Sequence, residues 1–172
     1  EPEMIILGKA LGGGLPLSAT ITTPEYSELL PWEYGFTQAG NPMACAAGLA
    51  MVEIMVRDDL PANSERIGTM MIEELEKIQE DSKLIGDVRG QGLMIGVELV
   101  RDRETREPAF EETDQLMAAC LEHGLMIGKT GPVFGANGNV AKFKPAVNVT
   151  EEDAMEMIDL FKRALGDVEA TL

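Results

Sequence analysis

Two long stretches of the chain place an apolar residue at every third or fourth position. The first contains Ile67, Met71, Leu75 and Ile78. The second contains Ala154, Ile158, Phe161 and Leu165. Because about 3.6 residues make one helical turn, this spacing predicts two helices that each bury one face. Thr150 is the predicted N-cap of the second helix, since three acidic residues follow it, where the positive end of a helix dipole favours them.

Other segments predict further helices and a set of short strands. Residues 42–56 are small and apolar with little polar face, which predicts a largely buried core or interface helix. Residues 111–123 predict a helix that ends at Gly124. Apolar runs predict strands at 4–7, 17–22, 93–99 and 125–127, a pair of strands around 140–149, and a short helix that starts at Pro24. The fold class is therefore α/β, and the strand at 4–7 is expected to be buried.

Helix-breaking residues between 58 and 63 predict a boundary inside the chain. Residues 1–58 would form the end of one domain and residues 59–172 a second, smaller domain. A chain of 172 residues is long enough for one compact domain and a piece of another. A strand-like run begins at Met4, almost at the first residue, so we expect upstream sequence to be missing and the chain to be a fragment.

Charge and composition narrow the classes of function. Acidic residues outnumber basic ones 30 to 14, giving a formal charge of −16, which argues against nucleic acid and anionic lipid as partners. No apolar run approaches the roughly 18 residues of a membrane span, and no export leader opens the chain. Cys45 and Cys120 stand far apart without a histidine cluster, so we expect no disulfide and no metal site. These features favour a protein of the reducing cytoplasm.

The densest chemical signal is the glycine-rich segment that follows Lys9. Three glycines at 12–14 permit a close backbone approach that other residues would block. A phosphate-binding P-loop has its glycines before the lysine, so the order here is wrong for that motif. The order suits a lysine at a strand end, in a partly desolvated pocket, that attacks an aldehyde. A lysine that only extends into solvent or forms an ion pair is the alternative that residue chemistry leaves open.

Four segments, in order, resemble the class III aminotransferases, which depend on pyridoxal 5'-phosphate. They are EPEMIILGKALGGGLPLSA at 1–19, FTQAGNPMACAAGLA at 36–50, GDVRGQGLMIGVELV at 86–100 and GNVAKFKPAVNVTEEDAMEMI at 138–158. The resemblance covers nearly the whole chain. It implies the carboxyl-terminal portion of a fold-type-I enzyme, with residues 1–58 ending the large cofactor domain and 59–172 forming the small α+β domain.

The resemblance also implies a reaction and its residues. The reaction is transamination between an amino acid or amine donor and a keto acid or aldehyde acceptor, with Lys9 forming the Schiff base and moving the proton. Thr37 matches a threonine that reaches the cofactor phosphate of a neighbouring subunit, which implies a homodimer with a shared active site. Gly40, Asn41 and Pro42 would mark a helix start beside it.

Lys142 departs from the pattern of the family, where many members carry an arginine that holds the substrate carboxylate. Lysine offers a point charge in place of a planar fork, so the usual geometry of substrate binding at Lys142 is in doubt. Strand alternation places Lys144 on the same side as Lys142, and the sequence leaves open which of the two lysines reaches the site.

Three other hypotheses remain open. The chain is a truncated module that cannot hold cofactor, since the family's partner for the pyridine nitrogen lies upstream of the catalytic lysine. Alternatively, the chain only dimerises through its apolar helix at 42–56. Within the family, residues 124–145 are most similar to the ω-amino-acid:pyruvate and alanine:glyoxylate branches, and residues 86–108 also resemble the dialkylglycine decarboxylases.

Overall fold

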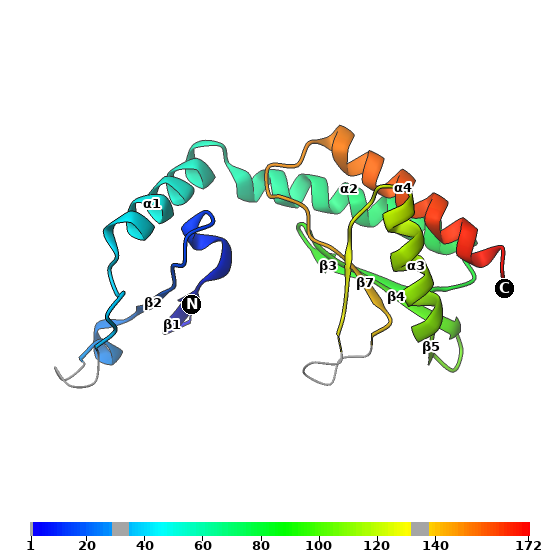
Figure 1. Cartoon of the computed structure of the whole chain (residues 1–172), viewed down its shortest axis with the longest axis horizontal. Helices are drawn as coiled ribbons and strands as arrows, with labels where there is room; N and C mark the ends of the chain where they lie inside the picture. The colour runs from blue at the N-terminus through cyan, green and yellow to red at the C-terminus, as the bar shows by residue number, and fades with distance from the viewer. Residues whose placement is uncertain (1, 29–34, 132–137) are drawn as a thin grey trace. The chain divides into compact units, whose positions relative to one another are not determined.

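A computed structural model describes residues 2–28, 35–131 and 138–172 (Figure 1). The chain divides into two compact units, Glu1–Leu60 and Pro61–Leu172. The division falls two residues after the boundary predicted from the sequence, because the second long helix begins at Leu60, with Pro61 in its first turn, and not after Asn63. Proline fits there because the first helical residues have no partner for a backbone N–H.

The first unit combines a two-stranded antiparallel sheet with one long helix. Strand β1 (Met4–Leu7) pairs with β2 (Ala19–Thr22), and the 3-10 helices η1 (Lys9–Gly12) and η2 (Pro24–Tyr26) follow them in turn. Helix α1 spans Pro42–Arg57 and contacts η1. A side-chain carbon built at Gly48 of α1 would lie 2.4 Å from Leu17 Cδ2, so glycine here lets Leu17 pack closely against the helix.

Two expectations about burial in this unit are wrong for the chain as it stands. Strand β1 forms where predicted, yet Ile6 is 78% exposed. Helix α1 also forms where predicted, yet only Ala44 and Gly48 are buried, and Leu49 is 61% exposed. Secondary structure follows from local sequence, whereas burial needs other segments to cover the apolar faces, and none among the described residues of this unit does so.

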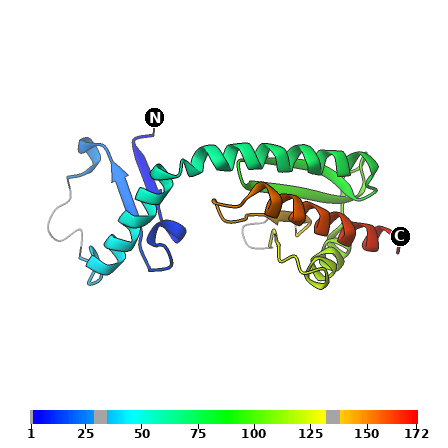
Figure 2. The same cartoon turned by 90° about the horizontal axis from the view of Figure 1, so that it is seen from above.

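The second unit contains three helices and a five-stranded antiparallel sheet. Its helices are α2 (Leu60–Asp81), α3 (Phe110–Glu122) and α4 (Glu151–Glu169). Its strands are β3 (Ile85–Gln91), β4 (Met94–Asp102), β5 (Glu107–Pro108), β6 (Gly128–Lys129) and β7 (Val140–Phe143). The strand order is β3-β4-β7-β6, and β5 pairs with the end of β4. Helices α2 and α4 lie alongside each other over the sheet, as both views show (Figures 1 and 2).

One hydrophobic core joins these elements. Alternate residues of β4 and β7 point into it, while Gly96, Glu98 and Lys142 belong to the other side of the strands. Every apolar residue predicted to line the two amphipathic helices is buried in this core. Phe143 of β7 and Phe161 of α4 meet edge to face with ring centroids 5.1 Å apart. The predicted cap is confirmed, since Thr150 Oγ1 accepts a hydrogen bond of 3.1 Å from the Asp153 amide.

The strand predictions were less accurate than the helix predictions. Residues 125–127 are not a strand, and the pairing starts at Gly128 in β6. Of the pair expected around 140–149, only β7 forms, and β3 is a strand that the sequence did not indicate. Glycine and charged residues interrupt β3, so its extended form comes from pairing with β4 rather than from its own composition.

Candidate active site

Lys9 follows β1 directly and opens the 3-10 helix η1. Its backbone adopts a left-handed conformation with φ of 56°, which few residues other than glycine adopt. Gly13 and Gly14, in the bend behind it, also have positive φ values, of 57° and 103°. The glycine-rich segment thus forms a tight turn, and the strained residue in it is the lysine with the candidate chemistry.

The Lys9 side chain lines a pocket of about 750 Å³ in the first unit. Residues from the β2 side and from the start of α1 complete the walls. Among the described residues of its wall, the polar ones besides Lys9 are Ser18, Thr20, Gln38 and Asn41, and none is acidic. Lys9 forms no ion pair with any residue that the structure describes. Lys9 therefore lines a pocket of ligand size in which no described residue offers a competing carboxylate.

One expectation for Lys9 is not met in these 172 residues. The sequence predicted a partly desolvated pocket, but Lys9 is exposed. The adjoining strand β1 is itself uncovered on its apolar side, so nothing shields the lysine from water. The nucleophile and the bend that holds it are in place, while the water-excluding cover that an activated lysine needs is not supplied by the described residues.

The segment that holds Thr37 lies beside this pocket. Thr37 is exposed in the turn at 37–40 and is not among the residues that line the pocket, whereas Gln38 and Asn41 are. The Asn41 side chain caps α1, since its Oδ1 accepts hydrogen bonds of 3.1 Å from the Met43 amide and 3.2 Å from the Ala44 amide. Pro42 is in the first turn, as predicted. Gln38 and Ser18 were not singled out from the sequence, although both lie in segments that carry the family resemblance.

Lys142 lies in the second unit, on β7. With Lys144 it lines a pocket of about 220 Å³, whose other walls are Met126, Ile127, Gly128, Pro145 and Met157. The two lysines therefore share one side of the strand, as alternation predicted. Neither forms an ion pair within the described ranges 2–28, 35–131 and 138–172.

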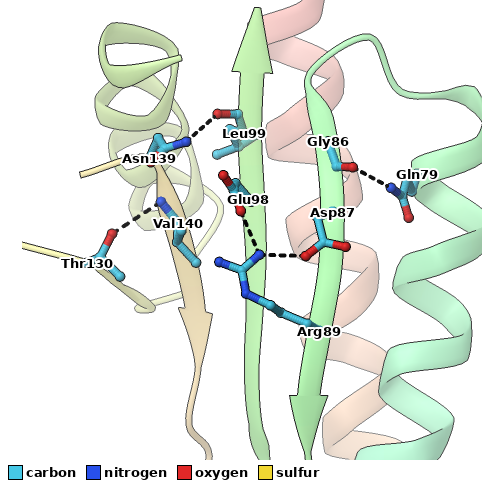
Figure 3. A network of polar contacts seen from close by, with 9 residues as sticks. All are labelled: Gln79, Gly86, Asp87, Arg89, Glu98, Leu99, Thr130, Asn139 and Val140. Atoms are coloured by element: carbon cyan, nitrogen blue, oxygen red, sulfur yellow. Dashed lines mark hydrogen bonds and ion pairs between the residues drawn. The ribbon is translucent and has the colours of Figure 1, made fainter. Parts of the chain in front are cut away.

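Arg89 forms an ion-pair network in the second unit. Its Nη1 donates to Asp87 Oδ2 at 2.6 Å and to Glu98 Oε2 at 2.7 Å, bridging β3 and β4 (Figure 3). The hydrogen bond that Arg89 donates to Asp87 is the main cause that raises the pKa of Arg89. Burial opposes this shift, and the contacts with Glu98 add to it. Arg89 is thus a cross-strand support.

His123 and the cysteines have structural roles. His123 caps α3, and its Nε2 lies 2.7 Å from Asp167 Oδ2 of α4. Cys120 is buried, and burial raises the pKa of its thiol to about 11, which makes it a core residue rather than a nucleophile. Cys45 is exposed, because the face of α1 around it is uncovered among the described residues.

The described part of the chain contains no group of three or more histidine, cysteine, aspartate or glutamate residues that could hold a metal ion. None of its helices combines the length and the apolar character of a membrane span.

The fold and the site together define a mixed α/β protein whose larger pocket is built beside an exposed lysine amine. The family model described as aminotransferase class-III matches residues 1–165. The chain belongs to this family, and the resemblance seen in its sequence is confirmed.

Individual relatives agree in sequence and in structure. The chain is 40% identical over 170 residues to the leucine/methionine racemase of Thermococcus litoralis, a match that covers 98% of this chain and 37% of that protein. It is 35% identical over 167 residues to a mitochondrial alanine–glyoxylate aminotransferase 2 of Pongo abelii, covering 95% and 32% of the two chains. A Bacillus anthracis aminotransferase structure superimposes with a TM-score of 0.88 at 32% identity, covering 96% of this chain and 39% of that one.

The chain corresponds to only part of each of these relatives. It spans roughly a third to two fifths of the proteins that it matches. Its fold is that part of the fold-type-I aminotransferases, as predicted.

Proposed function

We propose that this chain contributes to a pyridoxal-phosphate-dependent transamination, in which a small-molecule amino donor passes its nitrogen to a keto acid or aldehyde acceptor. The single observation that carries the proposal is the position of Lys9. Lys9 lines a pocket of about 750 Å³ and has no ion-pair partner among the described residues. The glycine-rich turn that follows it fixes the backbone from which its amine extends.

The residues around Lys9 fit part of what pyridoxal 5'-phosphate requires. A lysine amine can bond covalently to its aldehyde carbon, and the pocket volume lies within the range of about 300–1,000 Å³ that is usual for cofactor sites. When bound, the cofactor supplies an electron sink that makes the proton on the donor's α-carbon removable. An acidic partner for the pyridine nitrogen is not among the described residues of this pocket, which accords with a chain that spans only part of its relatives.

Lys9 would have two tasks in this chemistry. It holds the cofactor before substrate arrives, and its released amine then takes up and returns the substrate proton. The left-handed backbone at Lys9 suits such a role, because strained residues persist where the surrounding turn fixes the side chain for function. A general base must lie within hydrogen-bond distance of the proton that it moves. The turn fixes the backbone position of Lys9 and so limits where its amine can lie.

Thr37 and α1 support a homodimer with a shared site. Thr37 is exposed and is not a wall of the pocket in its own chain, which suits contact with cofactor phosphate held by another copy. Helix α1 exposes apolar side chains that a second copy would bury. The homodimer and the shared site are both inferred from the family resemblance. The exposure of Thr37 and of the apolar side chains of α1 supports them.

Lys142 would bind the acidic group of the substrate. It lines a small pocket with Lys144, and neither amine has an ion-pair partner among the described residues. Lysine binds anions as a point charge, so this contact would be less directional than an arginine fork.

Racemisation is a second candidate reaction, favoured by the 40% identity with the Thermococcus litoralis racemase. Both reactions begin with removal of the α-proton. They differ in the product: a racemase returns the amino acid with inverted configuration, whereas an aminotransferase yields a keto acid and needs an acceptor. Assay of one L-amino acid with and without pyruvate separates them, and carbon dioxide release would indicate the decarboxylase alternative.

The assignment of Lys9 can be tested by trapping. The chain is incubated with pyridoxal 5'-phosphate, reduced with borohydride and mapped by peptide mass spectrometry. We expect the reduced cofactor on the Lys9 peptide, loss of that label in Lys9→Ala, and normal labelling in Lys83→Gln, which removes another exposed lysine. Equal labelling of many lysines would contradict a specific site. No labelling at all would favour the truncated, non-catalytic module.

Location in the cytoplasm remains a prediction. The relative from Pongo abelii is a mitochondrial enzyme by name, and relatives in this family therefore do not all share one compartment.

A further inference from the structure

Lys142 lies between two glycines of the neighbouring strands. In the sheet register its partner on β4 is Gly96 and its partner on β6 is Gly128. A carbon added at Gly128 would lie 3.8 Å from Lys142 Cε, which places the lysine stem over the glycine. Gly128 therefore leaves a furrow along the β6 flank of the lysine. On the β4 flank, a carbon added at Gly96 would lie 3.1 Å from Val140 Cγ1, so the Val140 side chain borders that side.

Lys144 extends the same furrow. It stands two residues further along, roughly 6.6 Å at about 3.3 Å per extended residue, on the same side of the chain. Pro145 follows it and disfavours a helical backbone at Lys144, so the extended course that aligns the two lysines is maintained. Both lysines accordingly line the same pocket.

The pocket that these lysines line differs in charge from two other pockets of the second unit. The groove of about 460 Å³ between α2 and α4 mixes Lys77 and Lys162 with several carboxylates. A small pocket of about 40 Å³ mixes Arg103 and Arg106 with Asp87 and Glu98. The pocket of about 220 Å³ contains two lysines, apolar walls and no acidic residue. The chain has 30 acidic residues and a formal charge of −16, so a pocket lined by two lysines and no described carboxylate is unusual for it.

We propose that this pocket, formed by Lys142, Lys144 and the apolar residues Met126, Ile127 and Met157, binds a doubly charged acidic group of the phosphomonoester class. This proposal rests on the proposed function, in which Lys142 binds the acidic group of the substrate. The new elements are the charge and chemical class of that group and the role of Lys144 as a second residue that binds it.

Charge balance favours a dianion over a carboxylate. Two like charges at this spacing repel each other, and a single negative charge would leave one of the ammonium groups uncompensated. A phosphomonoester carries close to two negative charges above its second pKa of about 6, and it presents three acceptor oxygens to two point-like donors. A planar carboxylate is matched best by the arginine fork, which this chain lacks at position 142.

Size and lining limit the rest of the ligand. A volume of about 220 Å³ is smaller than the roughly 300–1,000 Å³ of a whole-ligand pocket, so it holds one end of a molecule. The methionine and isoleucine walls would contact a short apolar chain next to the acidic group, and methionine adapts to irregular shapes.

Calorimetric titration of the 172-residue chain tests the proposal with a matched pair of probes, n-butyl phosphate and pentanoate, at low salt and about two pH units above the second phosphate pKa. We expect butyl phosphate to bind about tenfold more tightly than pentanoate. Each of Lys142→Gln and Lys144→Gln should weaken phosphate binding by about fivefold, and the double variant more than either. Lys142→Arg should bind pentanoate more tightly than the unchanged chain does, because arginine matches a carboxylate. The ratio of the affinities for butyl phosphate and pentanoate should therefore fall.

Lys162→Gln serves as the control, because it removes a lysine of the same unit that lies outside this pocket. It should leave both affinities unchanged. Equal affinity for the two probes, or an equal loss in Lys162→Gln and Lys142→Gln, would overturn the proposal. Circular dichroism checks that each variant is folded. Because the titration needs neither cofactor nor turnover, its failure would leave the trapping result at Lys9 unaffected.

Discussion

The two units of the chain contain similar amphipathic patterns but differ in what covers them. In the second unit, Leu165 of α4 is 2% exposed and packs in a core to which all three helices and the sheet contribute. In the first unit, Leu49 of α1 is 61% exposed, and β1 and β2 also expose isoleucines. A leucine contributes roughly 1.5–3 kcal/mol only when it leaves water. The second unit therefore has what it needs to fold by itself, and the first depends on further protein for its stability.

The proposed chemistry is divided unequally between these units. Lys9 and Thr37 belong to the unit whose apolar faces are open, whereas Lys142 belongs to the unit with a complete core. Covering the first unit would bury apolar surface and remove water from around Lys9 in one step. The residues that would complete the fold of that unit are thus also expected to activate its lysine.

Hydrogen exchange on the intact chain provides the strongest test of this comparison. Backbone amides of β4 and α4 should exchange only through global unfolding, which costs about 5–15 kcal/mol for a domain of ordinary stability. Amides of α1 and β1 should exchange at close to the unprotected rate. Equal protection of α1 and α4, measured by mass spectrometry of peptides, would show that the first unit is stable without further cover.

A matched pair of leucine substitutions sharpens the same comparison. Leu165→Ala should lower the free energy of unfolding by about 2–5 kcal/mol, because it opens a cavity in the core. Leu49→Ala removes the same atoms from an exposed helix position. It should change the free energy of unfolding by no more than about 0.5 kcal/mol. Urea unfolding followed by circular dichroism measures both. A large loss in Leu49→Ala would mean that α1 is buried in solution, for example between two copies of the chain.

The helix caps give the smallest expected difference. Thr150→Ala removes the hydroxyl that caps α4 and should destabilise the second unit by about 0.5–2 kcal/mol. Asn41→Ala removes the equivalent cap of α1 and should lower helix content without moving the unfolding midpoint of the second unit. If Asn41→Ala did shift that midpoint, the two units would unfold together rather than separately.

Features set by local sequence could be predicted, and features set by distant contacts could not. The faces of α2 and α4, the Thr150 cap and the turn at Gly124 follow from residues within a few positions of one another. Strand β3 escaped prediction because its conformation depends on the register with β4. The burial of β1 was predicted wrongly. An apolar run indicates that a strand needs its side chains covered, but it does not indicate whether a segment that covers them is present.

The candidate site follows the same division. Lys9 was identified from its order relative to the glycines, and the shared side of Lys142 and Lys144 followed from strand alternation. The contributions of Ser18 and Gln38 to the Lys9 pocket depend on the way β2 and the turn before α1 come together in space. The glycines that flank Lys142 likewise depend on the strand order, which brings residues 96 and 128 to either side of residue 142.

The left-handed backbone of Lys9 has a consequence for the choice of inactive mutants. Alanine at this position would remove the amine but keep a Cβ atom in a conformation that costs an ordinary residue roughly 1–2 kcal/mol. Glycine would remove the amine and relieve the strain as well. Once further protein covers the first unit, Lys9→Gly should therefore melt at a higher temperature than Lys9→Ala, and it is the better starting protein for supplying a small external amine in place of the missing side chain.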